Sequence, residues 1–245
     1  MAESWLTFWV LAVVFVATLI RSAFGFGEAL VAVPLLALLI PVEVSAPLAV
    51  LVSITVAGVV LLQDWHHVQV RSTWRLVLAT LPGIPLGLVL LTAAAEQVVK
   101  AVLAVVIIAF SAYCLLGRRR VGLADDRWAW LFGFGAGVLG GAYGMNGPPL
   151  VIYGSLRGWS PAHFRATLQG YFLIASVVGM GFYWQAGLWT PELSRYYLWS
   201  FVPALAAIFL GRAINRRLRG RAFLRYVHAG LIVVGTVLLA QSLWR

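Results

Sequence analysis

Apolar residues form ten runs along the chain, separated by short segments that carry most of the charged residues. The runs lie near 5–22, 28–40, 45–62, 75–94, 98–116, 128–143, 147–156, 164–186, 196–211 and 224–243. A helix needs roughly 20 apolar residues to cross the hydrocarbon core of a bilayer, and most of these runs approach that length. The pattern therefore predicts an all-α membrane protein, folded as a polytopic helical bundle.

The composition leaves little material for anything outside the bilayer. Hydrophobic residues make up 62% of the 245 residues and charged residues 11%, whereas soluble domains carry about 25% charged residues. Residues 1–4 are weakly acidic and lack the basic segment of a cleavable signal peptide, so we expect Trp5 to begin a retained first span.

Positive charge is concentrated in four of the loops between the runs. The net charge is +10, and arginines dominate the loops 63–75, 117–127, 157–165 and 212–225. If every run crosses the bilayer, these four loops lie on one side, and both termini lie on the other. Positive loops face the cytoplasm, so we expect a multi-pass protein of the bacterial inner membrane with both termini in the periplasm. No basic stretch is long enough to form a nucleic-acid-binding face.

The chain contains an internal repeat. Residues 23–27, Ala-Phe-Gly-Phe-Gly, match residues 142–146, Ala-Tyr-Gly-Met-Asn, at an offset of 119. The two halves, 1–120 and 121–245, each hold five apolar runs. Because five is an odd number, the second half must start from the opposite side of the membrane. The sequence thus predicts two inverted-topology repeats, an arrangement common among secondary transporters.

The second and seventh runs are short, and each follows a glycine-rich break, which predicts a broken or re-entrant helix in each half. Unpaired backbone is tolerated at membrane depth only inside the protein or beside water. Each short helix would begin there with roughly half a positive charge and free N–H groups, which favours a small anion. The expected binding residues are Gly25, Phe26, Gly27, Gly144, Met145, Asn146, Gly147 and Pro148. The alternative is that the glycines serve close helix packing.

Five polar side chains near the breaks extend the candidate site. The amide of Asn146 could donate to an anion or tie the broken backbone together. Glu28 is a candidate for proton coupling, because intramembrane acids are costly, or it complements the helix dipole. Gln169 and Arg165 could line a pathway for the substrate, although Arg165 could instead snorkel to the interface. Arg21 either supplies a fixed charge to an anion or closes the end of its helix.

The sequence offers no motif for catalysis, a metal or a cofactor. Cys114 is the only cysteine, which excludes an intrachain disulfide and a multi-cysteine metal site. His66 and His67 are adjacent, so they point to different faces of a helix and make a poor metal pair. Together with Asp64 they support only the lesser alternative of a membrane-embedded enzyme. We expect neither enzymatic activity nor a cofactor.

Stretches around both breaks resemble a known family of membrane transporters. The Gly-Phe-Gly of residues 25–27, followed by the apolar residues 31–36, is similar to the first-half glycine motif of the TauE/SafE sulfite-exporter family. Residues 144–151 are similar to its second-half motif, and residues 159–161 and 164–169 continue the similarity. Many members carry a Gly-Gly-Gly run at these breaks. This chain lacks that run, so a glycine-triplet substrate site does not carry over unchanged.

The resemblance implies export of a small sulfur-containing anion across the inner membrane, driven by an ion gradient. The leading hypothesis is a proton-coupled secondary transporter that exports sulfite, an organosulfonate, or a related sulfur-containing or carboxylate anion. The alternative is a channel or carrier for a cation or a neutral metabolite. A cavity dominated by Glu28 and backbone carbonyls would favour a cation, whereas helix N-termini and arginines would favour an anion. We expect the lipid bilayer and the anion as partners, and the sequence leaves a homodimer open.

Overall fold

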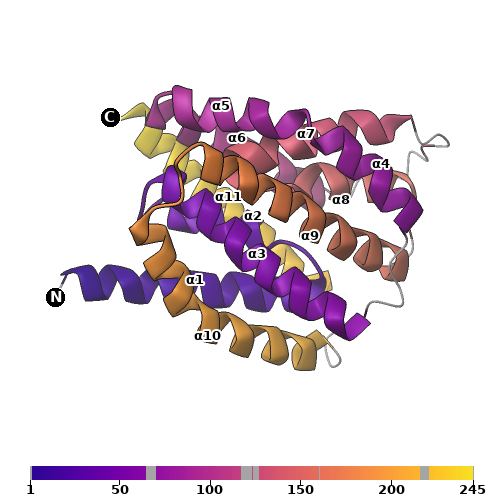
Figure 1. Ribbon diagram of the computed structural model, residues 1–245, viewed down its shortest axis with the longest axis horizontal. Coiled ribbons are helices and arrows are strands. Elements are labelled where there is room, and N and C mark those ends of the chain that lie inside the picture. Colours follow the sequence, from indigo (N-terminus) through magenta and orange to yellow (C-terminus); the bar gives the residue numbers. More distant parts are fainter. Residues whose placement is uncertain are drawn as a thin grey trace.

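The protein is a bundle of α-helices, with no strand among the residues that the structure describes (Figure 1). This computed structural model describes residues 2–64, 70–116, 123, 127–159, 161–215 and 221–244. The helices are α1 (Ala2–Phe24), α2 (Glu28–Leu36), α3 (Val42–Asp64), α4 (Val70–Thr80), α5 (Gly83–Ala93), α6 (Glu96–Leu115), α7 (Trp128–Tyr143), α8 (Gly147–Leu156), α9 (Pro161–Gln185), α10 (Pro191–Asn215) and α11 (Arg221–Leu243). The predicted all-helical class is confirmed. A helix satisfies its backbone hydrogen bonds internally, as apolar surroundings require.

Five helical stretches in the described part of the chain are long and apolar enough to cross a membrane. They are Ser4–Phe24, Val42–Val60, Trp74–Ala93, Glu96–Leu115 and Pro191–Ile214, with a shorter apolar helix at Val227–Leu243. Large hydrophobic side chains, such as Val202 and Leu198, are exposed on the outside of these helices. A lipid environment accommodates such a surface without cost, so the multi-pass membrane assignment follows.

The fourth apolar run is interrupted, unlike the continuous span that the sequence predicts. It divides into α4 and α5 at Pro82, which has no backbone N–H to donate to the preceding turn. Pro203 lies at the corresponding place in the second half, yet α10 continues through it. The two prolines thus lie at matching sequence positions, but the helix is interrupted at Pro82 and continues through Pro203.

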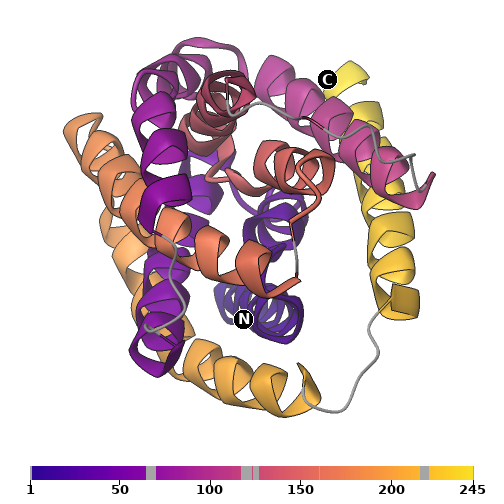
Figure 2. The same ribbon diagram turned by 90° about the vertical axis from the view of Figure 1, so that its right-hand side faces the viewer.

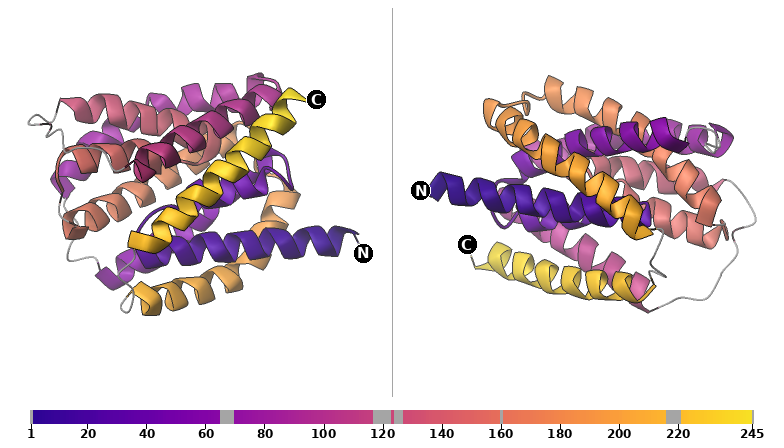
Figure 3. Two further views of the ribbon diagram at one scale, coloured as in Figure 1. Left: turned by 180° about the vertical axis from the view of Figure 1, so that it is seen from behind. Right: turned by 90° about the horizontal axis from the view of Figure 1, so that it is seen from below.

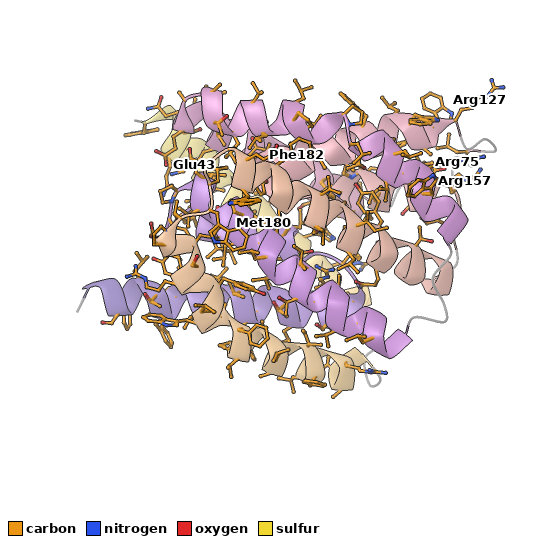
Figure 4. The ribbon with its side chains drawn as sticks, viewed as in Figure 1. Glu43, Arg75, Arg127, Arg157, Met180 and Phe182 are labelled. Atoms are coloured by element: carbon orange, nitrogen blue, oxygen red, sulfur yellow. The ribbon has the colours of Figure 1, made fainter. Side chains whose placement is uncertain are left out.

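Four charged residues outside the cavity lie at the two ends of the bundle. Both termini lie at one end in Figure 1, and Figure 4 places Glu43 at this end. Figure 4 places Arg75, Arg127 and Arg157 at the opposite end.

Two pairs of consecutive helices form hairpins in the bundle. α1 and α2 pack together and are joined by residues 25–27, and α7 and α8 pack together and are joined by residues 144–146. The chain before α7 lies beside the end of α8, because Arg157 Nη1 donates to the carbonyl of Leu123 at 2.8 Å. The second hairpin thus begins and ends at the end of the bundle that carries Arg75, Arg127 and Arg157 (Figure 4). The first hairpin begins at the end that carries both termini (Figure 1).

The two halves exchange packing partners. α1 packs on α10, the fourth span of the second half, and α7 packs on α4 and α5, the fourth span of the first half. Among the other contacts, α3 packs on α9, α6 on α11 and α2 on α8. Figure 3 shows α11 crossing α6 and α1 lying beside α10, and Figure 2 looks along the bundle onto this arrangement.

Glycines allow α7 to approach α4 and α5 very closely. A Cβ added to Gly137 would overlap the carbonyl oxygen of Thr80, and one added to Gly141 would overlap that of Ile84. Gly83 and Gly87 meet the backbone of α7 in the same way from the other side. For these four glycines, close packing of small residues in apolar surroundings is the role that the structure supports.

Candidate functional site

Both breaks depend on glycines with left-handed backbone conformations. Gly25 has φ 87°, Gly27 has φ 99° and Gly144 has φ 64°. Residues with a Cβ rarely adopt such angles, so glycine makes these turns possible. A Cβ at Gly144 would also lie 2.8 Å from Val50 Cγ2. At these breaks the glycines therefore form turns, and at Gly144 close packing adds to that requirement.

The two breaks meet at one buried cavity of about 30 Å³, which is room for about two water molecules. Its lining comes from both hairpins and from α3, α6 and α9: Arg21, Phe26, Gly27, Glu28, Ala29, Leu30, Ser53, Phe110, Gly144, Met145, Asn146, Gly147, Pro148 and Phe172. Every predicted binding residue of the breaks except Gly25 is in this lining. The structure therefore brings together residues that lie more than a hundred positions apart in the sequence.

Two helix N-termini face this region. α2 begins at Glu28 and α8 at Gly147, and no side chain caps either helix. The first N–H groups of a helix have no partner within it. In α8, Pro148 and Pro149 have no N–H, so only Gly147 can offer one there. Each N-terminus carries roughly half a positive charge. Because α2 and α8 contact one another, these partial charges act on the same small volume.

A buried ion pair crosses the first break. The guanidinium of Arg21, in the last turn of α1, pairs with the carboxylate of Glu28, and their side chains are only 3% and 2% exposed. Glu28 also accepts a hydrogen bond from Thr18 Oγ1 at 3.3 Å. Arg21 donates to Ser53 Oγ at 2.6 Å and lies 5.1 Å from the centre of the Phe172 ring. The structure thus places Arg21 in the interior at the cavity, not at the end of the bundle.

Gln169 connects this pair to the backbone of the first break. Its Oε1 accepts from Arg21 Nη2 at 3.3 Å, and its Nε2 donates to the carbonyl of Gly25 at 3.2 Å. Gln169 therefore links Arg21 to the backbone of the first break by two hydrogen bonds. It does not itself line the cavity. The side chain of Arg165, the other pathway candidate on α9, lies outside the described residues.

The second break carries a neutral polar group in place of a charged pair. Asn146 Nδ2 donates to the hydroxyl of Tyr171 at 3.4 Å, and that hydroxyl lies 2.6 Å from Thr80 Oγ1. Asn146 also packs so closely on Gly140 that a Cβ there would overlap its amide. The amide of Asn146 thus both lines the cavity and ties the break to α7 and α9.

The cavity favours an anion on balance of charge. Arg21 and Glu28 are the two ionisable residues in its lining, and they neutralise one another as a pair. The partial positive charges of two helix N-termini then remain. In addition, Arg21 Nε is buried without a hydrogen-bond partner, and guanidinium N–H groups are strong donors to oxyanions.

Sequence reasoning missed Ser53, Phe172, Phe110 and Thr18. These residues lie inside long apolar helices, and nothing in their immediate neighbours distinguishes them. One signal was available for two of them, because Ser53 and Phe172 are separated by 119 residues, the offset of the break motifs. Both contact Arg21, so the repeat relates two positions that share one partner.

Elsewhere in the described part of the chain, no group of three histidine, cysteine or acidic residues is close enough to hold a metal ion. His66 and His67 lie outside the described residues, as does the side chain of Asp64. His228 is buried, and its ring lies 5.7 Å from that of Phe110, edge to face.

The fold and the buried polar site define a polytopic α-helical membrane protein with a small charged cavity between two broken helices. The model of the family "Sulfite exporter TauE/SafE" matches residues 10–239, and the chain belongs to this family. Membership implies a membrane transporter of the sulfite-exporter type. Comparison with curated proteins and with solved structures gives no match.

Proposed function

We propose that the protein is a secondary active transporter that exports a small anion across the bacterial inner membrane, coupled to protons. The substrate class is sulfite, an organosulfonate, or a related sulfur-containing or carboxylate anion. The observation that carries the proposal is the convergence of Arg21 and two helix N-termini on one buried cavity. A buried guanidinium and free backbone N–H groups are the donors that oxyanions prefer.

The same proposal includes an inverted repeat of 1–120 and 121–245, with α1–α2 and α7–α8 as re-entrant hairpins. Two observations support it. The hairpins open toward opposite ends of the bundle, and the halves exchange packing partners in the pattern that a two-fold relationship produces. By the positive-inside rule, the end that carries Arg75, Arg127 and Arg157 faces the cytoplasm, and both termini face the periplasm.

Transport through this site requires the hairpins to move. The cavity of about 30 Å³ has room for about two water molecules, and a bound anion must still reach it from each side of the membrane. Transporters built from inverted repeats open a central site to one side and then to the other by moving one group of helices against another. We expect the tips of the two hairpins to separate at the glycine turns at 25–27 and 144–146.

The alternative of a cation carrier has less support from the charges at the site. Glu28 is the acid of the cavity lining, and its charge is neutralised by Arg21. A cation would therefore meet two positive helix ends without a free carboxylate. This balance of charge favours an anion.

Flux into liposomes tests the proposal. Purified protein is reconstituted, and uptake of sulfite, sulfoacetate and acetate is compared with uptake of sodium and of neutral glycerol. We expect saturable flux of at least one anion that responds to an imposed membrane potential. Absence of flux for every anion with folded protein, or flux of sodium alone, would reject the proposal.

A further inference from the structure

We propose that the cavity prefers monovalent anions, and that Glu28 sets this preference because it stays paired with Arg21 while an anion is bound. The inference rests on the proposed function, and it names the charge of the preferred substrate and the residue that determines it. It follows from the hydrogen-bond donors and the charges present at the first break.

Arg21 can hold an anion without releasing Glu28. Of the five N–H groups of its guanidinium, two on Nη1 donate to Glu28 and Ser53, and one on Nη2 donates to Gln169 Oε1. Nε–H and the second N–H of Nη2 therefore remain for an anion, and Nε is buried without a partner. Guanidinium N–H groups are strong donors to oxyanions.

The carboxylate of Glu28 is held at both of its oxygens. Its Oε2 accepts from Arg21, and its Oε1 accepts from Thr18 Oγ1 at 3.3 Å. The side chain is 2% exposed, and a carboxylate buried to this extent would be strongly disfavoured without its guanidinium partner. An anion that uses the remaining donors of Arg21 avoids this cost, so we expect the ion pair to persist when the anion binds.

The charge of the site then matches one negative charge. Arg21 and Glu28 sum to zero, and they are the ionisable side chains among the described residues of the lining. The N-termini of α2 and α8 contribute roughly half a positive charge each, or about one charge together. A monovalent anion neutralises this charge. A divalent anion would leave about one negative charge buried without a partner, which is costly in apolar surroundings.

The second break contributes no further cation to the lining. At the offset of 119 that relates the two breaks, the positions that correspond to Arg21 and Glu28 are Gly140 and Gly147. Asn146 is the polar side chain that this break adds to the lining, and its amide is neutral. Most of the other lining side chains are apolar, among them Phe26, Phe110, Met145 and Phe172. The second charge of a dianion therefore meets no cationic partner in the described part of the site.

Glu28 is then a specificity-determining residue, because its carboxylate cancels the formal positive charge of the cavity. Without that carboxylate, the charge of Arg21 would be added to that of the helix N-termini, and the total would rise to about two. Such a cavity would suit a dianion. Removal of the charge of Glu28 should therefore change which anion is preferred, and not only how stably the protein folds.

Binding of two matched ligands tests the inference. Sulfoacetate carries two negative charges at about pH 8, where both of its acidic groups are ionised. Its carboxamide, in which an amide replaces the carboxylate, has nearly the same shape and a single charge. We expect calorimetric titration to show that the wild-type protein binds the carboxamide at least about tenfold more tightly, because the second charge is left unpaired. Sulfoacetate should still bind, with the lower affinity.

Two variants assign the preference to Glu28. Glu28→Gln removes the charge and keeps the size of the side chain, so the preference for the carboxamide should disappear, with sulfoacetate bound as tightly or more tightly. Glu43→Gln changes a carboxylate at the end of the bundle that carries both termini, and it should keep the wild-type ratio of affinities (Figures 1 and 4). A merely structural role of Glu28 would weaken the binding of both ligands alike and leave their ratio unchanged.

The wild-type ratio keeps the test decisive if Glu28→Gln does not fold. Equal affinities in the wild type, or tighter binding of sulfoacetate, overturn the inference, as does an unchanged ratio in folded Glu28→Gln. In each of these cases the anion carrier still stands. Absence of binding for both ligands also overturns the inference, and the proposed function falls as well only if the liposome panel shows no anion flux.

Discussion

Arg21 and Glu28 form an ion pair that joins the two helices of the first hairpin across its glycine turn. Both side chains are buried, in a chain with only 11% charged residues. Taking two charges out of water is expensive, and a buried pair is weak evidence for stability. Ionisable residues within membrane segments usually mark transport pathways. The location of this pair at the cavity is therefore the strongest single indication of function.

Removal of one partner of this pair should destabilise the protein more than removal of both. Arg21→Met leaves Glu28 buried without a partner, which costs about 3–5 kcal/mol. Arg21→Met combined with Glu28→Leu should recover most of this loss, because no unpaired charge remains. Thermal unfolding in detergent measures the difference. A double variant as unstable as Arg21→Met alone would show that the pair is not the source of the loss.

Asn146→Ala should weaken anion binding while the protein still folds. The amide lines the cavity and donates to Tyr171, and one such hydrogen bond contributes about 1 kcal/mol, or roughly a fivefold change in affinity. Tyr171→Phe, which removes only the partner of the amide, should have a smaller effect on binding. Calorimetric titration of both variants gives the comparison. Unchanged affinity in Asn146→Ala would mean that the residue serves only the broken backbone.

The sequence identified the all-helical class and the positions of the two breaks because both depend on local patterns. Apolar runs predict helices by length, and the glycines at 25 and 144 predict breaks because they permit backbone angles that other residues avoid. Local patterns did not distinguish the effect of Pro82 from that of Pro203, since packing around each proline decides whether a helix continues.

The composition of the site beyond the breaks depended on tertiary contacts. Arg21 and Glu28 are seven residues apart, and only the turn between them brings a guanidinium to a carboxylate. Ser53 and Gln169 reach Arg21 from two other helices. A single sequence gives no direct information on which faces of separate helices meet, so these partners could not be predicted.

Gly141→Ala should destabilise the protein, whereas Gly135→Ala on the same helix should not. A Cβ at position 141 would overlap the carbonyl of Ile84, and overpacking typically costs about 1–3 kcal/mol. At position 135 a Cβ would lie 4.0 Å from Pro149 Cγ, an ordinary contact. Both changes increase helix propensity equally, so thermal unfolding of the pair isolates the effect of packing. Equal stability of the two variants would contradict the close approach of α7 to α5.

Cysteine labelling in cells tests the proposed orientation. In a Cys114→Ser background, Glu43→Cys should react with an impermeant maleimide from the periplasm, and Arg127→Cys only after the membrane is permeabilised. Phe26→Cys and Met145→Cys should react poorly from either side, because the tips of the hairpins lie inside the bundle. Reaction of Glu43→Cys and Arg127→Cys from the same side would contradict the topology. Full reaction of Phe26→Cys from the cytoplasm would indicate that the first run crosses completely.

The central claim is that Arg21 binds the transported anion at the meeting point of the two hairpins. The most direct measurement is sulfoacetate flux into liposomes that contain wild-type protein, Arg21→Gln or Arg195→Gln. Arg195 is an exposed arginine of α10 and serves as the matched control. We expect saturable flux with the wild type and with Arg195→Gln, and none above empty liposomes with folded Arg21→Gln. Wild-type flux in Arg21→Gln would contradict the claim.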